Sequence, residues 1–213
     1  MADRKGTQMK KGLFITVEGP DGSGKSTQIE YIKGFMQANG HEAIFTREPG
    51  GTPISEKIRA IILDKENTEL DPLTEAFLYA ASRAQHVSQL IKPALERGRI
   101  VVSDRFVDSS IAYQQYARGL GECVSVINEY AIEGCIPDVT FLLKVDPETA
   151  LGRLEGPSDR LEDESIQFHR KVYEGYLELE RKFPERIVSI DASLSAEEIR
   201  SIIIGHVMRL LGE

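Results

Sequence analysis

The sequence predicts an α/β fold of three layers, in which a five-stranded parallel sheet lies between two layers of helices. Short apolar runs alternate along the chain with longer segments in which apolar residues recur every three or four positions, as expected for strands alternating with helices. Parallel strands need crossover connections, for which these helices are available. A chain of 213 residues, 41% of them hydrophobic, can bury one sizeable core, so we expect residues 1–213 to form a single domain.

Glycine and proline residues separate the predicted elements along the chain. A strand, a glycine-rich turn and a helix come first, and a second strand leads through Pro49, Gly50 and Gly51 into the next helix. We expect strands at 13–17, 43–45, 100–102, 141–145 and 187–190. We expect helices at 25–37, 54–63 and 71–96, between 103 and 133 with a break near Gly119 and Gly121, from 147, up to 183 after an interruption at 156–158, and at 195–211, with Ser195 as N-cap.

The acidic composition argues against nucleic acid as a partner. The formal net charge is −8, whereas binding of a polyanion depends on a basic surface that neutralises phosphates. An anionic small-molecule substrate must therefore meet a local basic pocket.

The sequence indicates neither a membrane span nor a stapled, disulfide-rich fold. No apolar run approaches the roughly 20 residues of a membrane helix, and residues 1–11 are polar and basic without an apolar signal core. We expect a cytoplasmic protein with a flexible tail at 1–11. Cys123 and Cys135 lie outside any CxxC or Cys/His metal spacing, so they are interpreted as ordinary semi-buried thiols.

Residues 19–26 form the clearest motif. They read Gly-Pro-Asp-Gly-Ser-Gly-Lys-Ser, which fits GxxxxGK[ST], and they lie between a predicted strand and a predicted helix. Glycines allow backbone N–H groups to turn toward phosphate oxygens, and the helix N-terminus adds its positive dipole end. The alternative, a glycine turn with a solvated lysine, does not explain this context. We expect ATP to contact Gly19, Pro20, Asp21, Gly22, Ser23, Gly24, Lys25, Ser26 and Thr27.

Two side chains are candidates for holding a divalent cation. Lys25 should neutralise the β- and γ-phosphates, and the hydroxyl of Ser26 should ligate Mg²⁺. Asp104 follows the apolar run at 100–102, at the carboxyl end of a predicted strand, where open parallel sheets bind ligands. The alternative for Asp104 is a surface aspartate that caps the next helix.

A GTP-dependent switch protein would also contain this loop. The sequence has no Asn-Lys-x-Asp motif, and no Asp-x-x-Gly follows the loop. Both absences disfavour a guanine-nucleotide switch.

Further polar clusters fall at predicted strand ends, at residues 46–51 and 103–106. Between them, Tyr79 and Arg83 are four residues apart on one predicted helix and therefore share a face. An aromatic ring beside a guanidinium suits a flat base with hydrogen-bond acceptors. Ordinary packing of an aromatic residue against an arginine stem is the alternative.

Five segments together resemble the thymidylate kinases. They are EGPDGSGKST (18–27), TREPGGTP (46–53), LYAASRAQH (78–86), SDRFVDSSIAYQ (103–114) and DRLE (159–162), in the order of that family. The resemblance implies a P-loop kinase fold with a helical lid. It also implies transfer of the γ-phosphate of ATP to dTMP with Mg²⁺, in a homodimer.

The resemblance also implies roles for individual residues. Tyr79 would stack on thymine, Arg83 would donate to a thymine carbonyl, and Arg47 and Arg105 would hold the acceptor phosphate. The implied substrate-binding set is Arg47, Glu48, Tyr79, Arg83, Arg105, Ser110, Tyr113 and Gln114, with Asp21 near the acceptor sugar and phosphate.

The lid is expected at about residues 152–163. One branch of the family places a catalytic arginine within the phosphate-binding loop, and this chain has none there; the other branch supplies it from the lid. Arg153 and Arg160 bracket the Gly/Pro/Ser stretch at 156–158, although solvated charges at helix ends are the alternative. The expected catalytic residues are Asp21, Lys25, Arg105, Arg153 and Arg160.

Two other functions remain open at this point. A related P-loop kinase could phosphorylate another nucleotide or nucleoside, and an ATP-binding regulatory module could use the same fold without turnover, because fold alone does not determine function.

Overall fold

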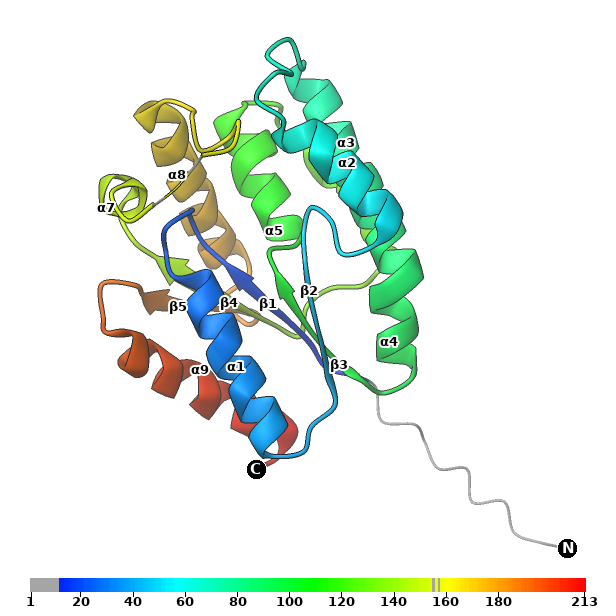
Figure 1. The fold of residues 1–213 in the computed structure, drawn as a ribbon, viewed down its shortest axis with the longest axis vertical. Coiled ribbons are helices and arrows are strands. Elements are labelled where there is room, and N and C mark those ends of the chain that lie inside the picture. The colour runs from blue at the N-terminus through cyan, green and yellow to red at the C-terminus, as the bar shows by residue number, and fades with distance from the viewer. Residues whose placement is uncertain (1–11, 155, 157) are drawn as a thin grey trace, which may run out of the picture.

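The computed structural model describes residues 12–154, 156 and 158–213. The expected flexible tail at 1–11 lies outside these residues. Figure 1 shows a central sheet with helices on both faces, as the sequence predicts.

All five strands are parallel, and their spatial order is β2-β3-β1-β4-β5. The first strand therefore lies in the centre, and the chain changes its winding direction on either side of it. Crevices at such a reversal are where open parallel sheets bind ligands. The strands are β1 (Phe14–Glu18), β2 (Ala43–Arg47), β3 (Ile100–Asp104), β4 (Val139–Lys144) and β5 (Ile187–Asp191).

The helices connect these strands, and α2, α3, α8 and α9 each begin at a side chain that caps them. Ser195, the expected N-cap, forms a reciprocal capping box with Glu198 at the start of the last helix. The helices are α1 (Lys25–Ala38), α2 (Pro53–Leu63), α3 (Pro72–His86), η1 (Val87–Ile91), α4 (Lys92–Glu96), α5 (Val107–Ser110), η2 (Ile111–Ala117), α6 (Cys123–Ile132), α7 (Pro147–Leu151), α8 (Ile166–Lys182) and α9 (Ala196–Leu211).

Alternate residues of the strands point to opposite faces of the sheet, where they supply one hydrophobic cluster on one face and two on the other. Ile15 and Val17 of β1 pack with residues of α1 and α9, which lie side by side in Figure 1. Phe14 faces the other way and packs against η1 and α4, while Leu142 of β4 packs against α8. This arrangement confirms the predicted three layers.

Three local features differ from the expectations. The helix expected at 71–96 is continuous but has a π-helical stretch, η1, in its middle, and a second π-helical stretch, η2, follows α5. The described residues of the expected lid, 152–163, form turns, and the preceding helix α7 ends at Leu151. Among the residues described, no helix is both long and apolar enough to cross a membrane.

Candidate active site

A cavity of about 450 Å³ opens at the carboxyl edge of the sheet. Strand pairing aligns this edge, because Arg47 of β2 and Val17 of β1 are both register partners of Asp104 on β3. The cavity walls contain most of the predicted site residues: Asp21, Gly22, Gly24, Lys25, Ser26, Arg47, Glu48, Tyr79, Arg83, Asp104, Arg105, Tyr113, Gln114 and Arg153. Gly19, Pro20, Ser23, Thr27, Ser110 and Arg160 are not among the lining residues.

The phosphate-binding loop joins β1 to α1 and leaves the N-terminus of α1 open. Gly24 precedes α1 in the left-handed conformation, no side chain caps the helix, and its first turn contains no acidic residue. By contrast, the side chains of Thr52, Asp71, Ser165 and Ser195 cap α2, α3, α8 and α9. The free N–H groups and the positive dipole end of α1 therefore remain available to an anion.

Gly22 is required by close packing of this loop. Its φ is +80°, and a Cβ atom there would lie 1.9 Å from the carbonyl oxygen of Ala150. Any other residue at position 22 would therefore force the loop away from α7.

Lys25 lies inside the loop and is almost fully buried. Its Nζ donates to the carbonyl oxygens of Gly19 at 3.0 Å and Pro20 at 2.8 Å. Burial, reinforced by the positive charge of Arg105, lowers the pKa of Lys25 to about 8. A triphosphate placed beside this ammonium would raise that pKa again, because a nearby anion favours the charged form.

Asp104 and Ser26 fit a divalent cation that is also held by phosphates. Both line the cavity, and Asp104 Oδ1 is buried without a hydrogen-bond partner in the part of the chain that the structure describes. Carboxylate and hydroxyl oxygens are ligands that Mg²⁺ accepts. The described residues include no cluster of three or more His, Cys, Asp or Glu that could hold a metal unaided, so phosphate and water oxygens would have to complete the coordination shell.

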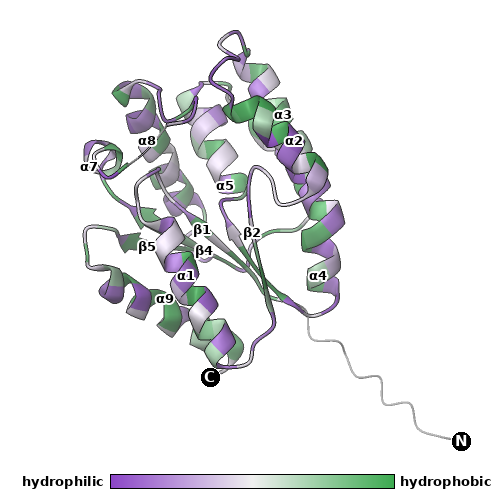
Figure 2. Cartoon of the chain, in the orientation of Figure 1, coloured by the Kyte–Doolittle hydropathy of each residue, from purple (hydrophilic) through white to green (hydrophobic). Residues whose placement is uncertain are grey.

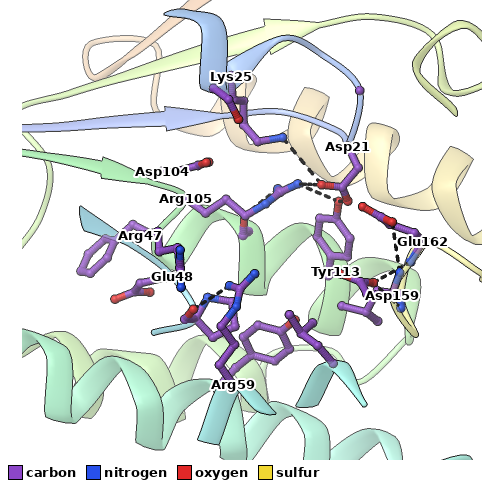
Figure 3. A pocket seen from close by; sticks show the side chains of 18 of the residues that line it. Asp21, Lys25, Arg47, Glu48, Arg59, Asp104, Arg105, Tyr113, Asp159 and Glu162 are labelled. Carbon is purple, nitrogen blue, oxygen red and sulfur yellow. Dashed lines mark hydrogen bonds and ion pairs between the residues drawn. The ribbon is translucent and has the colours of Figure 1, made fainter. Parts of the chain in front are cut away.

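Arg105 connects the loop to Tyr113 across the cavity. Its guanidinium donates to Asp21 Oδ1 at 2.5 Å and to the Gly19 carbonyl at 2.9 Å, and Tyr113 also donates to Asp21 at 3.0 Å (Figure 3). Burial alone would raise the pKa of Asp21, but Arg105 and Lys25 outweigh it and hold that pKa well below its usual range. Arg105 has φ +65°, a left-handed conformation that is strained for a side chain of this size.

Glu18 is a buried acid that the sequence analysis did not assign to the site. The backbone N–H of Phe106 donates to its carboxylate at 2.7 Å, and the hydroxyls of Ser109 and Tyr176 donate at 2.6 Å and 2.9 Å. Those two hydroxyls also accept from Arg105, at 3.1 Å each. Burial and the nearby carboxylate of Asp108 raise the pKa of Glu18 to about 7. Its position directly after the apolar run at 13–17 was the only feature of the sequence that could have pointed to Glu18 as a site residue.

A second buried network lies behind Arg83. Glu48 accepts from Arg83 Nε at 2.7 Å and lies 2.9 Å from Nδ1 of His86, whose Nε2 is 2.7 Å from the hydroxyl of Thr46. His86, like Glu18, was missed. Gly51 closes this cluster, because at φ +83° its Cβ would lie 2.6 Å from His86 Nε2. The conformation and the contact together explain the second glycine of the segment 46–53.

Arg83 is held by four donor contacts and remains part of the cavity wall. Besides Glu48, it donates to Ser110 Oγ at 2.9 Å, to the Phe106 carbonyl at 3.0 Å and to Asn128 Oδ1. Ser110 thus orients Arg83 and does not itself line the cavity.

The other predicted site arginines, Arg47, Arg153 and Arg160, differ in whether they line the cavity and in which groups they bind. Arg47 is half exposed, lines the cavity and pairs with Glu56 at 3.1 Å. Arg153 lines the cavity and donates to the Ala192 carbonyl at 3.1 Å. Arg160 is bound elsewhere, to Glu75 Oε2 at 2.6 Å and to the Ile62 carbonyl at 2.9 Å.

The chain is similar in sequence to known thymidylate kinases. The family model described as "Thymidylate kinase" matches residues 17–203. The thymidylate kinase of Halalkalibacterium halodurans is 50% identical over 196 residues, which cover 90% of this chain and 93% of that protein. The thymidylate kinase of Clostridium novyi is 48% identical over 196 residues, which cover 90% of this chain and 96% of that protein.

A solved structure shows the same likeness in three dimensions. The crystal structure of thymidylate kinase from Ehrlichia chaffeensis superposes with a TM-score of 0.74 at 32% identity, covering 93% of this chain and 99% of that one. The family model spans the phosphate-binding loop, both buried networks and the segment with Arg153 and Arg160. The chain therefore belongs to the thymidylate kinase family.

Proposed function

We infer that this protein transfers the γ-phosphate of ATP to dTMP, giving ADP and dTDP. The observation that carries this function is one cavity in which the open N-terminus of α1 and Lys25 face Arg105, Arg83 and Tyr79. Two anionic substrates can meet there over a short path, which is what phosphoryl transfer requires.

The donor side is formed by the loop at 19–26. The free N–H groups at the start of α1 bind phosphate oxygens, and Lys25 neutralises the β- and γ-phosphates. Ser26 and Asp104 would hold Mg²⁺. When bound, the ion supplies charge neutralisation to the phosphates during transfer. Gly19, Pro20 and Ser23 belong to the same loop and Thr27 to the first turn of α1, and none of the four lines the cavity.

The acceptor side lies between the sheet edge and α3. Arg105 and Arg47 orient the phosphate of dTMP, and Asp21 and Tyr113 lie beside its sugar. Tyr79 stacks on the base. Arg83, held by Glu48 and Ser110, donates to a base carbonyl. Because Arg105 contacts Asp21 and the carbonyl of Gly19, the same guanidinium ties the acceptor phosphate to the donor loop.

An ADP-release assay across acceptors tests this function. With saturating ATP and Mg²⁺, dTMP should stimulate ADP release more than UMP, CMP, AMP or thymidine does. One methyl group in an apolar pocket is worth roughly 1 to 3 kcal/mol, so dUMP should be a poorer acceptor that is not fully excluded. Stronger stimulation by another nucleotide would indicate a different kinase, and no stimulation by any acceptor would favour a regulatory module.

We also propose that the protein is a homodimer. Large apolar side chains are exposed on α2, α3 and α6, and α3 packs against both of the other helices. Segments coloured as hydrophobic lie along α2 and α3 in Figure 2, away from α1 and α9. This α2–α3–α6 face comprises Ile54, Ile61, Leu73, Phe77, Val126 and Tyr130. A twofold contact through it would bury these side chains from both protomers at once.

For the place of action we propose the cytoplasm. The reaction consumes ATP and a nucleoside monophosphate, and both are cytoplasmic metabolites.

A further inference from the structure

Glu75 is a fully buried carboxylate on α3, one helical turn before Tyr79. Three side chains from other parts of the chain donate to it. Gln114 Nε2 lies 2.9 Å from Oε1, Arg118 Nη2 lies 3.0 Å from Oε2, and Arg160 Nη2 lies 2.6 Å from Oε2. A carboxylate between two guanidinium groups is ionised. Burial alone would raise the pKa of Glu75, but the hydrogen bonds from Arg118, Gln114 and Arg160 lower it overall.

The charge on Glu75 determines which way the amide of Gln114 points. An ionised carboxylate can only accept hydrogen bonds, so Gln114 must present its NH₂ group to Glu75. The planar amide then turns its oxygen to the opposite side. Gln114 lines the cavity, and its Oε1 is buried without a hydrogen-bond partner among the described residues. A buried, unpaired acceptor in a cavity wall calls for a donor from a ligand.

Arg83 supplies the complementary donor on the same wall. Its guanidinium has five N–H groups, and four of them are used by Glu48, Ser110, Asn128 and Phe106. Glu75, Tyr79 and Arg83 follow one another at intervals of four residues, so they form one stripe on α3. A donor and an acceptor beside a stacking ring match the C=O and N3–H of thymine or uracil. Cytosine presents an amino group and a bare ring nitrogen there instead.

We infer that Glu75 is a specificity-determining positioning residue, which holds the Gln114 amide in the one orientation that accepts an imide base and rejects cytosine. This inference rests on the proposed function and names the residue that determines which pyrimidine the acceptor site takes. Glu75 itself touches no substrate and acts through Gln114.

The test is the ratio of kcat/KM for dTMP to kcat/KM for dCMP. In Glu75→Gln, the side chain at 75 can donate or accept, so the Gln114 amide can turn over. The ratio should fall by about tenfold to a hundredfold, the effect of leaving one buried polar group mismatched. Loss of the Arg160 contact changes turnover for both acceptors alike, so the ratio isolates base recognition.

Two further variants separate orientation from structure. Glu164→Gln is the matched control, because Glu164 pairs with Arg118 at 2.6 Å and makes no hydrogen bond to Gln114 in the part of the chain that the structure describes; its ratio should equal that of the wild type. The double variant Glu75→Gln/Gln114→Glu places a carboxylate at 114 that receives the amide of residue 75 and still offers an acceptor to the base. Its dTMP/dCMP ratio should return to near the wild-type value, at least tenfold above the ratio of Glu75→Gln.

The outcomes distinguish the role of Glu75 from the proposed phosphoryl transfer. An unchanged ratio in Glu75→Gln with dTMP still phosphorylated overturns the role of Glu75 and leaves the proposed function standing, as does failure of the double variant to recover selectivity. Absence of phosphorylation of any nucleotide by the wild type overturns the proposed function instead. If Glu75→Gln does not fold, the wild type with ¹⁵N-labelled glutamine decides: in the dTMP complex the Gln114 NH₂ protons should show NOEs to side-chain protons of Glu75 and none to the thymine base, and the reverse pattern contradicts the inference.

Discussion

Buried charged side chains at the site are stabilised by specific partners that the sequence places far apart. Glu18 ends β1, yet its hydrogen bonds come from Phe106, Ser109 and Tyr176. Two of those partners also contact Arg105. The carboxylate of Glu18 therefore helps to fix the hydroxyls that orient the arginine, although it does not line the cavity.

The raised pKa of Glu18 predicts a pH-dependent stability. The pKa rises from an ordinary 4.5 to about 7 in the folded chain, because burial and Asp108 disfavour the charged form. The folded state therefore binds the proton more tightly than the unfolded state does. Protonation of Glu18 therefore contributes to the free energy of unfolding. This contribution is fully present below pH 4.5 and is lost as pH rises through 7.

Relative to Glu18→Gln, the wild type should lose up to about 3 kcal/mol of unfolding free energy between pH 5 and pH 8, since one pKa unit corresponds to about 1.4 kcal/mol. Urea unfolding of both proteins at the two pH values measures this difference. A constant gap between the two proteins would show that Glu18 titrates normally.

At this scale the sequence was informative only where residues form a contiguous motif. Lys25, Ser26 and Gly24 could be placed because their spacing fits one backbone geometry. Glu75 and His86 could not, because their importance comes from partners 39 and 38 residues away in the chain. No local pattern marks a buried carboxylate whose partners lie in distant parts of the chain.

Among the elements, α3 and the segment 152–163 both contribute side chains to the cavity wall. The structure places Arg153 in the cavity wall and Arg160 on Glu75. Figure 3 shows Asp159 and Glu162 of the same segment together in the cavity wall. For Arg160 to reach the transferring phosphate, it must leave Glu75 and the Ile62 carbonyl. We propose that the segment acts as a lid that makes this exchange when both substrates are bound.

Arg160→Ala should lower kcat at saturating substrates on the order of 10³-fold, as removal of an arginine that stabilises the transferring group does. The matched control is Arg170→Ala, because Arg170 is exposed and, among the described residues, pairs only with Glu148. A kcat for Arg160→Ala within about threefold of wild type, together with a large loss in Arg153→Ala, would assign the role to Arg153.

The order of strands and helices was predictable because the two kinds of element differ in the spacing of their apolar residues. Glycine and proline residues also mark where many of the elements end. The helix at 71–96 and the Ser195 cap are examples, since both depend on local sequence. The π-helical stretches η1 and η2 were not predictable. They change the helical register within segments of ordinary helical composition, and η2 carries Tyr113 and Gln114 to the cavity.

At the scale of the whole molecule, the apolar α2–α3–α6 face is the feature that a monomer leaves unexplained. Phe77 is 53% exposed and Tyr130 is 80% exposed. Burying one such side chain completely is worth about 1.5 to 3 kcal/mol, and twofold symmetry applies the gain twice. The sequence alone could not separate core from surface on these helices, because that depends on which faces neighbouring helices already cover.

Phe77→Glu should convert the protein from a dimer to a monomer at micromolar concentration, as measured by size-exclusion chromatography with light scattering. Met208→Glu on α9 is the control, because Met208 is also exposed but lies on another face. A monomeric wild type, or an equally strong effect of Met208→Glu, would count against the α2–α3–α6 face as the dimer contact.

³¹P NMR of the protein with ATP, Mg²⁺ and dTMP tests whether one cavity holds both nucleotides and passes a phosphoryl group between them without releasing it to water. The ADP and dTDP signals should grow in equal amounts, and inorganic phosphate should not accumulate. Growth of inorganic phosphate without dTDP, or unchanged ATP signals, would show that no such transfer takes place.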